Sequence, residues 1–277
     1  MKLDPTRKLA SLCWLAAGLG LLGAGCGDDG GGSAGGEGSG GAVSPRTAGE
    51  PDLAGSITVF AAASLTDAFG EIADEFEAAN PGVSVESNFG ASSALREQIL
   101  AGAPADVFAS ANLSNMDQVV EADAAAGDAR TFATNRLEIV VPAGNPADVT
   151  GLAAFGDDDL LVGLCAAEVP CGDLGREALA NAGVTPAVDT EEPDVRSLLT
   201  KVEAGELDAG LVYATDVLAA GDAVEGIEIP AADNVVAEYP IATLAEAGGA
   251  EVADAFVAYV LSDAGQDILA SYGFDSP

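Results

Sequence analysis

Predominantly apolar runs alternate with segments of helical periodicity along most of this chain of 277 residues. Residues 56–62 form such a run, which is typical of a strand buried on both faces, and apolar residues then recur at helical spacing up to the Asn-Pro-Gly turn at 80–82. Further strands are predicted at 83–88, 106–110, 137–142, 160–164 and 209–212. Helices are predicted at 92–101, 173–182 and 195–204, with two more in 249–272, broken near 262–265. This order predicts an α/β fold with mainly parallel sheets flanked by helices.

The composition excludes several classes of function. The chain has 10 Lys and Arg against 45 Asp and Glu, a formal net charge of −35, so we expect no binding to nucleic acid or to anionic membrane surfaces. It has no His, which excludes the Ser-His-Asp triad, the Cys-His pair and every metal site built on His. A hydrophobic content of 49% is enough to build a large core.

The first residues read as a leader for export. Three cations precede an apolar run at 9–24, which is short for a membrane span. Leu22-Gly-Ala-Gly-Cys26 is similar to a lipobox, although its Leu lies four residues before the Cys instead of the usual three. We predict a lipoprotein signal peptide at 1–25 and lipidation of Cys26. The alternative is an ordinary secretory signal cleaved nearby.

A flexible tether is predicted after the leader. Residues 27–41 are almost entirely Gly, Ser, Asp and Glu, a composition with nothing to bury, and we assign 26–52 to the tether. An anchored Cys followed by such a segment favours an exported protein, held by a lipid at the outer face of the cytoplasmic membrane.

Two cysteines fall in the predicted folded part, Cys165 and Cys171. In an oxidising compartment we expect them to form a disulfide, because they lie six residues apart and no activating His or Lys is near in sequence. The short loop would contribute about 2 kcal/mol of stability by chain entropy. A reactive thiol is the alternative.

Two turns between a predicted strand and the following helix carry hydroxyl groups. Ser64 follows the first strand, and Ser92 and Ser93 follow the second, next to Gly90. In open α/β sheets ligands bind beyond the carboxyl ends of strands, where helix amides and dipoles favour an anion. Each serine could instead be a simple helix cap.

The later part of the chain offers further donors. Cys171 precedes a predicted helix and would present its backbone N–H, and Asp194 reads as an N-cap that leaves the amide of Val195 pointing outward. Tyr213 ends a buried run, so its phenol could donate into a cleft or pack in the core.

These candidates are all neutral donors, with no Lys or Arg among them. A fully ionised oxyanion has acceptors only, so donors without a nearby carboxylate suit it. Phosphate near neutral pH retains a proton and favours a site with an acceptor. The donor set therefore suits a proton-free dianion such as molybdate, tungstate or sulfate.

Several ordered motifs closely resemble the molybdate-binding proteins of ABC importers. They cover nearly all of residues 56–274, namely TVFAAASLTDAF at 58–69, FGASSAL at 89–95, AGAPADVF at 101–108, EVPCG at 168–172, DVR at 194–196, AGLVYATD at 209–216 and YGF at 272–274. The resemblance implies a two-lobed periplasmic-binding-protein fold (type II), with one lobe of 53–136 plus 238–277 and another of 137–237. It also implies an ABC permease as partner, no cofactor and a monomer.

The resemblance also implies the ligand set. The hydroxyls and amides of Ser64 and Ser92 would hold the oxyanion from one lobe, and the amides of Cys171 and Val195 with the Tyr213 hydroxyl from the other. Cys171 stands where Ala is common in the family. Ala91 replaces a frequent Ser, which leaves Ser93 as a competitor of Ser92.

The expected function is capture of molybdate or tungstate for uptake. A binding protein for sulfate or another small oxyanion is the nearer alternative. An exported serine hydrolase is the alternative of another class. It would need a base, and Lys201, the one Lys outside the leader, lies within a predicted helix.

Overall fold

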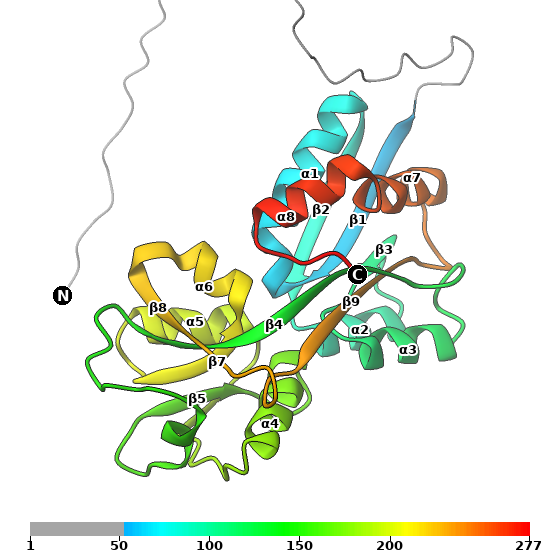
Figure 1. Ribbon diagram of the computed structural model, residues 1–277. Helices are drawn as coiled ribbons and strands as arrows, with labels where there is room; N and C mark the ends of the chain where they lie inside the picture. The colour runs from blue at the N-terminus through cyan, green and yellow to red at the C-terminus, as the bar shows by residue number, and fades with distance from the viewer. Residues whose placement is uncertain (1–52) are drawn as a thin grey trace, which may run out of the picture. The chain divides into compact units, whose positions relative to one another are not determined.

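A nine-stranded sheet runs through residues 53–277, the part of the chain that the computed structural model describes (Figure 1). The strand order is β2-β1-β3-β9-β4-β7-β5-β6, and β8 pairs with β4 beside this path. The strands are β1 Ala54–Ala62, β2 Gly82–Gly90, β3 Val107–Ala109, β4 Arg130–Pro142, β5 Val162–Cys165, β6 Thr190–Glu192, β7 Ala209–Tyr213, β8 Val224–Glu228 and β9 Val236–Thr243.

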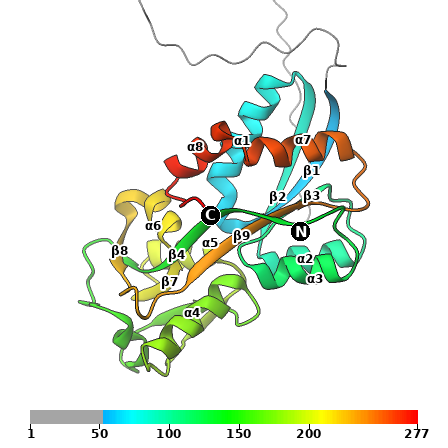
Figure 2. The ribbon, with the colours of Figure 1, turned by 45° about the vertical axis from the view of Figure 1, so that its right-hand side comes forward.

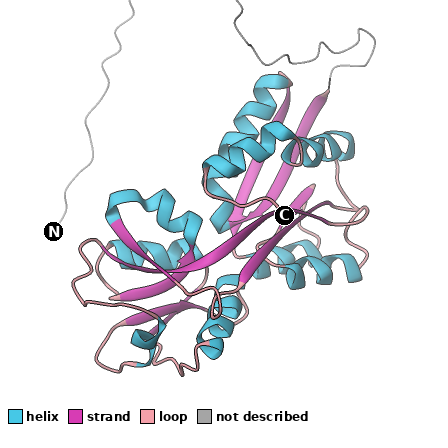
Figure 3. Ribbon diagram, in the orientation of Figure 1, coloured by secondary structure: helices cyan, strands magenta, loops and turns pink. Residues whose placement is uncertain are grey.

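Helices flank this sheet (Figures 1 and 3). The α-helices are α1 Thr66–Ala79, α2 Ser92–Leu100, α3 Leu113–Glu121, α4 Pro170–Asn181, α5 Val195–Glu203, α6 Ala214–Ala220, α7 Ala250–Val260 and α8 Asp263–Ser271. Within residues 53–277 there are also three short 3-10 helices: η1 Ala63–Leu65, η2 Leu152–Gly156 and η3 Gly221–Ala223. The α/β class predicted from the sequence is therefore confirmed.

The prediction of mainly parallel sheets is wrong, because the sheet is mixed. The pairs β1–β2, β1–β3, β5–β6 and β5–β7 are parallel, whereas every pair that involves β4 or β9 is antiparallel. The βαβ units supply the parallel pairs, and β4 and β9 insert between them in the opposite sense. The first half of β4 is rich in polar residues and only partly buried, and in β9 Glu238 and Pro240 interrupt the apolar residues, so neither segment forms a continuous apolar run in the sequence.

The long strand β4 joins two groups of elements. Its first half, up to Arg136, pairs with β9, and its second half, from Leu137, pairs with β7 and β8. We call the group around β1, β2, β3 and β9 the first lobe and the group around β5 to β8 the second lobe. In both ribbon views α1, α7 and α8 lie together in the first lobe and α4, α5 and α6 belong to the second (Figure 2). The lobe limits at 136–137 and 237–238 stay a prediction.

A large apolar core extends through both lobes. In the first lobe it contains aromatic rings in edge or tilted contact, with Phe69 and Phe76 of α1 against Phe256 of α7. A smaller cluster under α2 and α3 centres on Phe108. Within residues 53–277, no helix is long and apolar enough to cross a membrane.

The predicted signal peptide, Cys26 and the tether lie outside the described residues. Within the described residues, the position of the strand ends is what matters for function. β1, β2 and β7 each run directly, or within one residue, into a helix, and β5 reaches α4 after four residues. Backbone amides at these helix starts have no intrahelical acceptor.

Candidate functional site

The five residues predicted to bind a ligand line one small cavity. Ser64 and Ser92 come from the first lobe, and Cys171, Val195 and Tyr213 from the second. The space that it leaves for the centre of a water-sized sphere is about 10 Å³, close to what one water molecule needs, so the cavity excludes an extended organic molecule.

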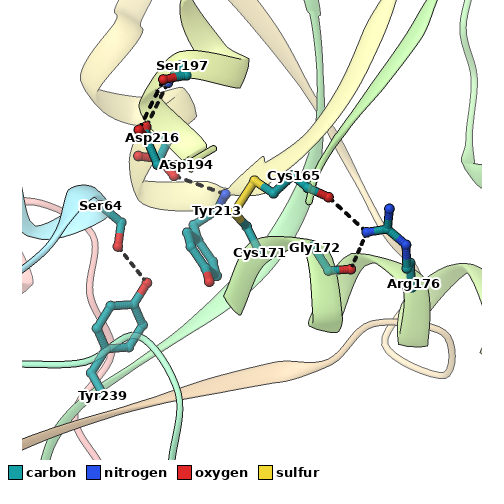
Figure 4. The surroundings of a disulfide bond; sticks show 10 residues. All are labelled: Ser64, Cys165, Cys171, Gly172, Arg176, Asp194, Ser197, Tyr213, Asp216 and Tyr239. Atoms are coloured by element: carbon teal, nitrogen blue, oxygen red, sulfur yellow. Dashed lines mark hydrogen bonds between the residues drawn. A yellow bond between two sulfur atoms is a disulfide. The ribbon is translucent and has the colours of Figure 1, made fainter. Parts of the chain in front are cut away.

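Ser64 lies in η1, directly after β1, and is buried. It does not cap a helix: its Oγ shares a hydrogen bond of 3.0 Å with the hydroxyl of Tyr239 in β9 (Figure 4). The alternative that this serine is a simple cap is therefore not what the structure shows. Tyr239 fixes the position of the Ser64 hydroxyl at the wall of the cavity.

Ser92 is the first residue of α2 and is only 1% exposed. Its Oγ accepts a hydrogen bond of 3.0 Å from the backbone N–H of Ala111, so its own proton can point elsewhere. Ala111 also lines the cavity, next to the serine that it orients. Ser93 is buried as well, but it is not among the residues that line the cavity.

The start of α4 presents one amide to the cavity. Pro170, the first residue of the helix, has no N–H, and the amides of Gly172 and Asp173 both donate to the carbonyl of Val169. Among the described first-turn groups this leaves the Cys171 N–H as the donor at the cavity. The helix begins three residues before the predicted position because Pro is well suited to a first helical position.

A disulfide joins Cys171 to Cys165 at the end of β5 (Figure 4). The loop between them is closed tightly: a Cβ on Gly172 would lie 1.9 Å from the carbonyl oxygen of Ala166. Arg176 tightens it further, since its Nη1 donates to the carbonyls of Cys165 and Gly172 at 2.8 and 3.0 Å. The amide of Cys171 is thus held rigidly against the strand.

The start of α5 presents the second amide. Asp194 caps this helix as predicted, because its carboxylate accepts from the N–H and the hydroxyl of Ser197 at 2.9 and 3.0 Å. The carboxylate is therefore engaged with its own helix, although Asp194 lines the cavity. Val195 is the first helical residue, so its amide has no intrahelical acceptor.

Tyr213 ends β7 and is 1% exposed. Its hydroxyl has no hydrogen-bond partner among the described residues, and its ring lies beside Cys171 in Figure 4. Burial, together with the neighbouring Tyr239 and Asp216, holds the pKa of Tyr213 well above its ordinary value. The phenol is therefore neutral and has a proton to donate.

The electrostatics of the cavity come from dipoles and not from cations. None of the described residues that line it is Lys or Arg. Lys201, the one Lys among the described residues, lies in the neighbouring groove and bonds to the carboxylate of Glu192, so it is not a free base beside either serine. Hydroxyls and helix amides that converge on a sheltered space can bind a small anion without a counter-charge.

Sequence reasoning missed the residues that support this site. Nothing in the sequence marked Tyr239, because it lies in a strand that was not predicted, or Ala111, which acts through its backbone. Asp216 was also missed. It is fully buried, its Oδ2 accepts from the Tyr213 N–H at 3.1 Å, and its Oδ1 lies 3.3 Å from Nε of Arg196.

Comparisons with known proteins agree with this architecture. Residues 57–275 match the family described as "Bacterial extracellular solute-binding protein". The molybdate-binding protein ModA of Mycobacterium tuberculosis H37Rv is 43% identical over 230 residues, which cover 83% of this chain and 88% of the relative.

Two solved structures share the fold. The periplasmic molybdate-binding protein of Azotobacter vinelandii has a TM-score of 0.70 at 18% identity, covering 80% of this chain and 99% of that one. The sulfate-binding protein SubI of M. tuberculosis H37Rv has a TM-score of 0.72 at 20% identity, covering 80% and 86%. Both likenesses in fold agree with the two-lobed periplasmic-binding-protein fold predicted for this chain from its sequence. This chain belongs to the family of bacterial extracellular solute-binding proteins.

Proposed function

We propose that this protein captures molybdate outside the cell and delivers it to the permease of an ABC importer. The open lobes would bind the oxyanion, closure would complete the donor set, and the closed form would dock on the permease. The relatives named as molybdate-binding proteins, at 43% identity, support this proposal.

One observation carries the proposal: five residues from both lobes, all neutral donors, line one small cavity that no cation among the described residues lines. Ser64, Ser92 and Tyr213 would donate through hydroxyls, and Cys171 and Val195 through amides. Such a set suits an anion that carries no proton of its own, because the site then needs no acceptor. Hydrogen phosphate carries a proton, which in this cavity would face the protons of the hydroxyl and amide donors instead of an acceptor.

Titration calorimetry with molybdate, tungstate, sulfate and phosphate tests the proposal. We expect one-to-one binding of molybdate, weaker binding of sulfate and little heat with phosphate. A pair of variants tests the site: Ser92→Ala should weaken molybdate binding at least tenfold, and Ser93→Ala should leave it within twofold. No binding of any of the four anions by folded protein would refute the function.

Two alternatives keep the same fold. Tungstate has the charge and shape of molybdate, and we propose that it binds too. A sulfate-binding protein shares the fold at a TM-score of 0.72, so tight sulfate binding in the same titration would change the substrate and leave the architecture. The family is one of binding proteins, and we expect no hydrolase activity: a generic ester should not be cleaved above the uncatalysed rate.

The family description supports an exported protein. We further propose that it acts as a monomer, that residues 1–25 are a signal peptide and that Cys26 becomes the lipidated first residue, followed by the tether. Metabolic labelling with a fatty acid analogue tests this: label should enter the wild type and be absent from Cys26→Ala. Equal labelling of both proteins would refute lipidation at this residue.

A further inference from the structure

One guanidinium connects the two lobes beside the cavity. Arg196, the second residue of α5, bonds through Nη2 to the carboxylate of Asp67 in α1 of the first lobe. On its other side, Nε lies 3.3 Å from Oδ1 of Asp216 in α6 of the second lobe. The side chain of Asp216 is 0% exposed, whereas those of Arg196 and Asp67 are 29% and 43% exposed, so the guanidinium runs from a buried carboxylate to one at the surface.

Each member of this triad lies close in sequence to a group at the cavity. Asp67 comes three residues after Ser64, Arg196 directly follows Val195, and Asp216 accepts the backbone N–H of Tyr213 at 3.1 Å. The triad and the cavity therefore share the same turns. A movement that separates the lobes has to break the bond between Arg196 and Asp67, whereas Arg196 and Asp216 belong to one lobe and move together.

The burial of Asp216 gives Arg196 a fixed position. A carboxylate that is fully buried needs a cation at hand, and Oδ1 of Asp216 makes no hydrogen bond among the described residues, so its electrostatic partner is the Arg196 guanidinium 3.3 Å away. Arg196 and Asp216 belong to the same lobe, so we expect the guanidinium to stay over this side chain when the lobes separate, most firmly above about pH 7, where Asp216 is ionised. The Nη2 atom of Arg196 then faces the first lobe, where it forms an ion pair with the Asp67 carboxylate.

We propose that Arg196 is an interlobe latch: held by Asp216, it binds Asp67 when the lobes close and so slows release of the bound oxyanion. The inference rests on the proposed function for its ligand. Neither Arg196 nor Asp67 lines the cavity, and both are positioning residues. The latch predicts an effect on dissociation and not on association, because the pair with Asp67 forms only after the lobes meet.

The decisive variant is Asp67→Asn, which removes the interlobe charge and keeps the shape of the side chain. Asp74→Asn is the matched control, since Asp74 is an exposed carboxylate on the same helix and is paired with no cation among the described residues. Stopped-flow measurements on the full-length protein with molybdate should show dissociation about fivefold to tenfold faster in Asp67→Asn. Association should stay within twofold of the wild type, and Asp74→Asn should behave as the wild type.

A double-mutant cycle separates the latch from a general loss of packing. Arg196→Gln should speed dissociation at least as much as Asp67→Asn, and adding Asp67→Asn to it should have no further effect. Additive effects of the two substitutions, or wild-type dissociation in Asp67→Asn, would overturn the latch. Should Arg196→Gln fail to fold because Asp216 loses its cation, Asp67→Asn alone still decides.

A readout without ligand keeps this inference separate from the proposed function. Hydrogen–deuterium exchange of the segments with η1 and the first turn of α5 should be at least twofold faster in ligand-free Asp67→Asn than in the wild type. Equal exchange would overturn the latch. If the wild type bound none of the four oxyanions, the proposed function would fail, and the exchange result would still judge the latch.

Discussion

At the scale of single residues, we expect the hydroxyl of Tyr213 to lower the stability of the ligand-free protein and to strengthen binding of the anion. It is buried without a partner among the described residues, a state that costs free energy in the absence of a ligand. Tyr213→Phe should therefore leave the melting temperature unchanged or raise it, while molybdate binds tenfold to a hundredfold more weakly, about 1–3 kcal/mol. Calorimetry and thermal unfolding of one preparation measure both.

Tyr272→Phe is the control for this substitution. The Tyr272 hydroxyl donates to Glu71 at 2.8 Å on the surface, so its removal should change neither quantity by more than a small amount. Unaltered molybdate affinity in Tyr213→Phe would show that the phenol does not reach the anion.

Asp216 gives the second residue-scale prediction. Burial raises the pKa of Asp216 from 3.8 to about 7; Arg196 and the Tyr213 N–H oppose this, and Asp67 and Asp194 add to it. The folded protein therefore holds a proton that the unfolded chain releases near pH 4. Stability falls as the pH rises from about 4 to 7, by on the order of 4 kcal/mol at most, and is level above that window.

Asp216→Asn removes this contribution. The wild type's free energy of unfolding, measured relative to that of the variant, should fall between about pH 4 and 7, because the contributions of the other carboxylates are the same in both proteins. Urea titrations at several pH values measure the difference. A difference that does not vary with pH would mean that Arg196 keeps the carboxylate ionised throughout, against the effect of burial.

At the scale of elements, helix starts determine the site, and α4 shows how sensitive they are. The first turn of α4 packs so closely on the end of β5 that a Cβ on Gly172 would lie 1.9 Å from the Ala166 oxygen. Gly172→Ala must displace this turn and the Cys171 amide, so we expect lower stability by several kcal/mol and loss of tight molybdate binding.

The control is Gly70→Ala in α1, where an added Cβ meets nothing within 4 Å. There Ala should stabilise the helix by roughly 0.5–1 kcal/mol and leave binding unchanged. Thermal unfolding and calorimetry of the two variants measure these effects. Wild-type binding by Gly172→Ala would show that the position of this turn does not matter for the ligand.

The same elements show what the sequence could predict. Strands buried on both faces, such as β1 and β7, were found because continuous apolar runs mark them. β9 was missed because Glu238 and Pro240 interrupt its apolar residues, and with it the role of Tyr239 was missed. Backbone donors were predictable only where a cap or a family motif located a helix start, as at Asp194. Long-range partners such as Ala111 and Asp216 have no local signal.

At the scale of the whole molecule, the charge of −35 conflicts with the binding of a dianion. The attraction in the cavity and the repulsion by the surface charge act over different distances. Inside the cavity, hydroxyls and amides act over hydrogen-bond distances, whereas the surface charge acts on the approaching ligand over the Debye length, about 8 Å at physiological ionic strength. Affinity can therefore be high while association is slowed.

The prediction is that salt speeds association. Between about 20 and 300 mM sodium chloride, the association rate constant of molybdate should rise severalfold, because the Debye length falls from roughly 20 Å to below 6 Å and the repulsion is screened. Stopped-flow tyrosine fluorescence can follow this, with sodium acetate at equal ionic strength as a control for specific chloride effects. A rate that falls with salt would mean that a local positive field in the groove of Arg196 and Lys201 outweighs the net charge, despite their ion pairs.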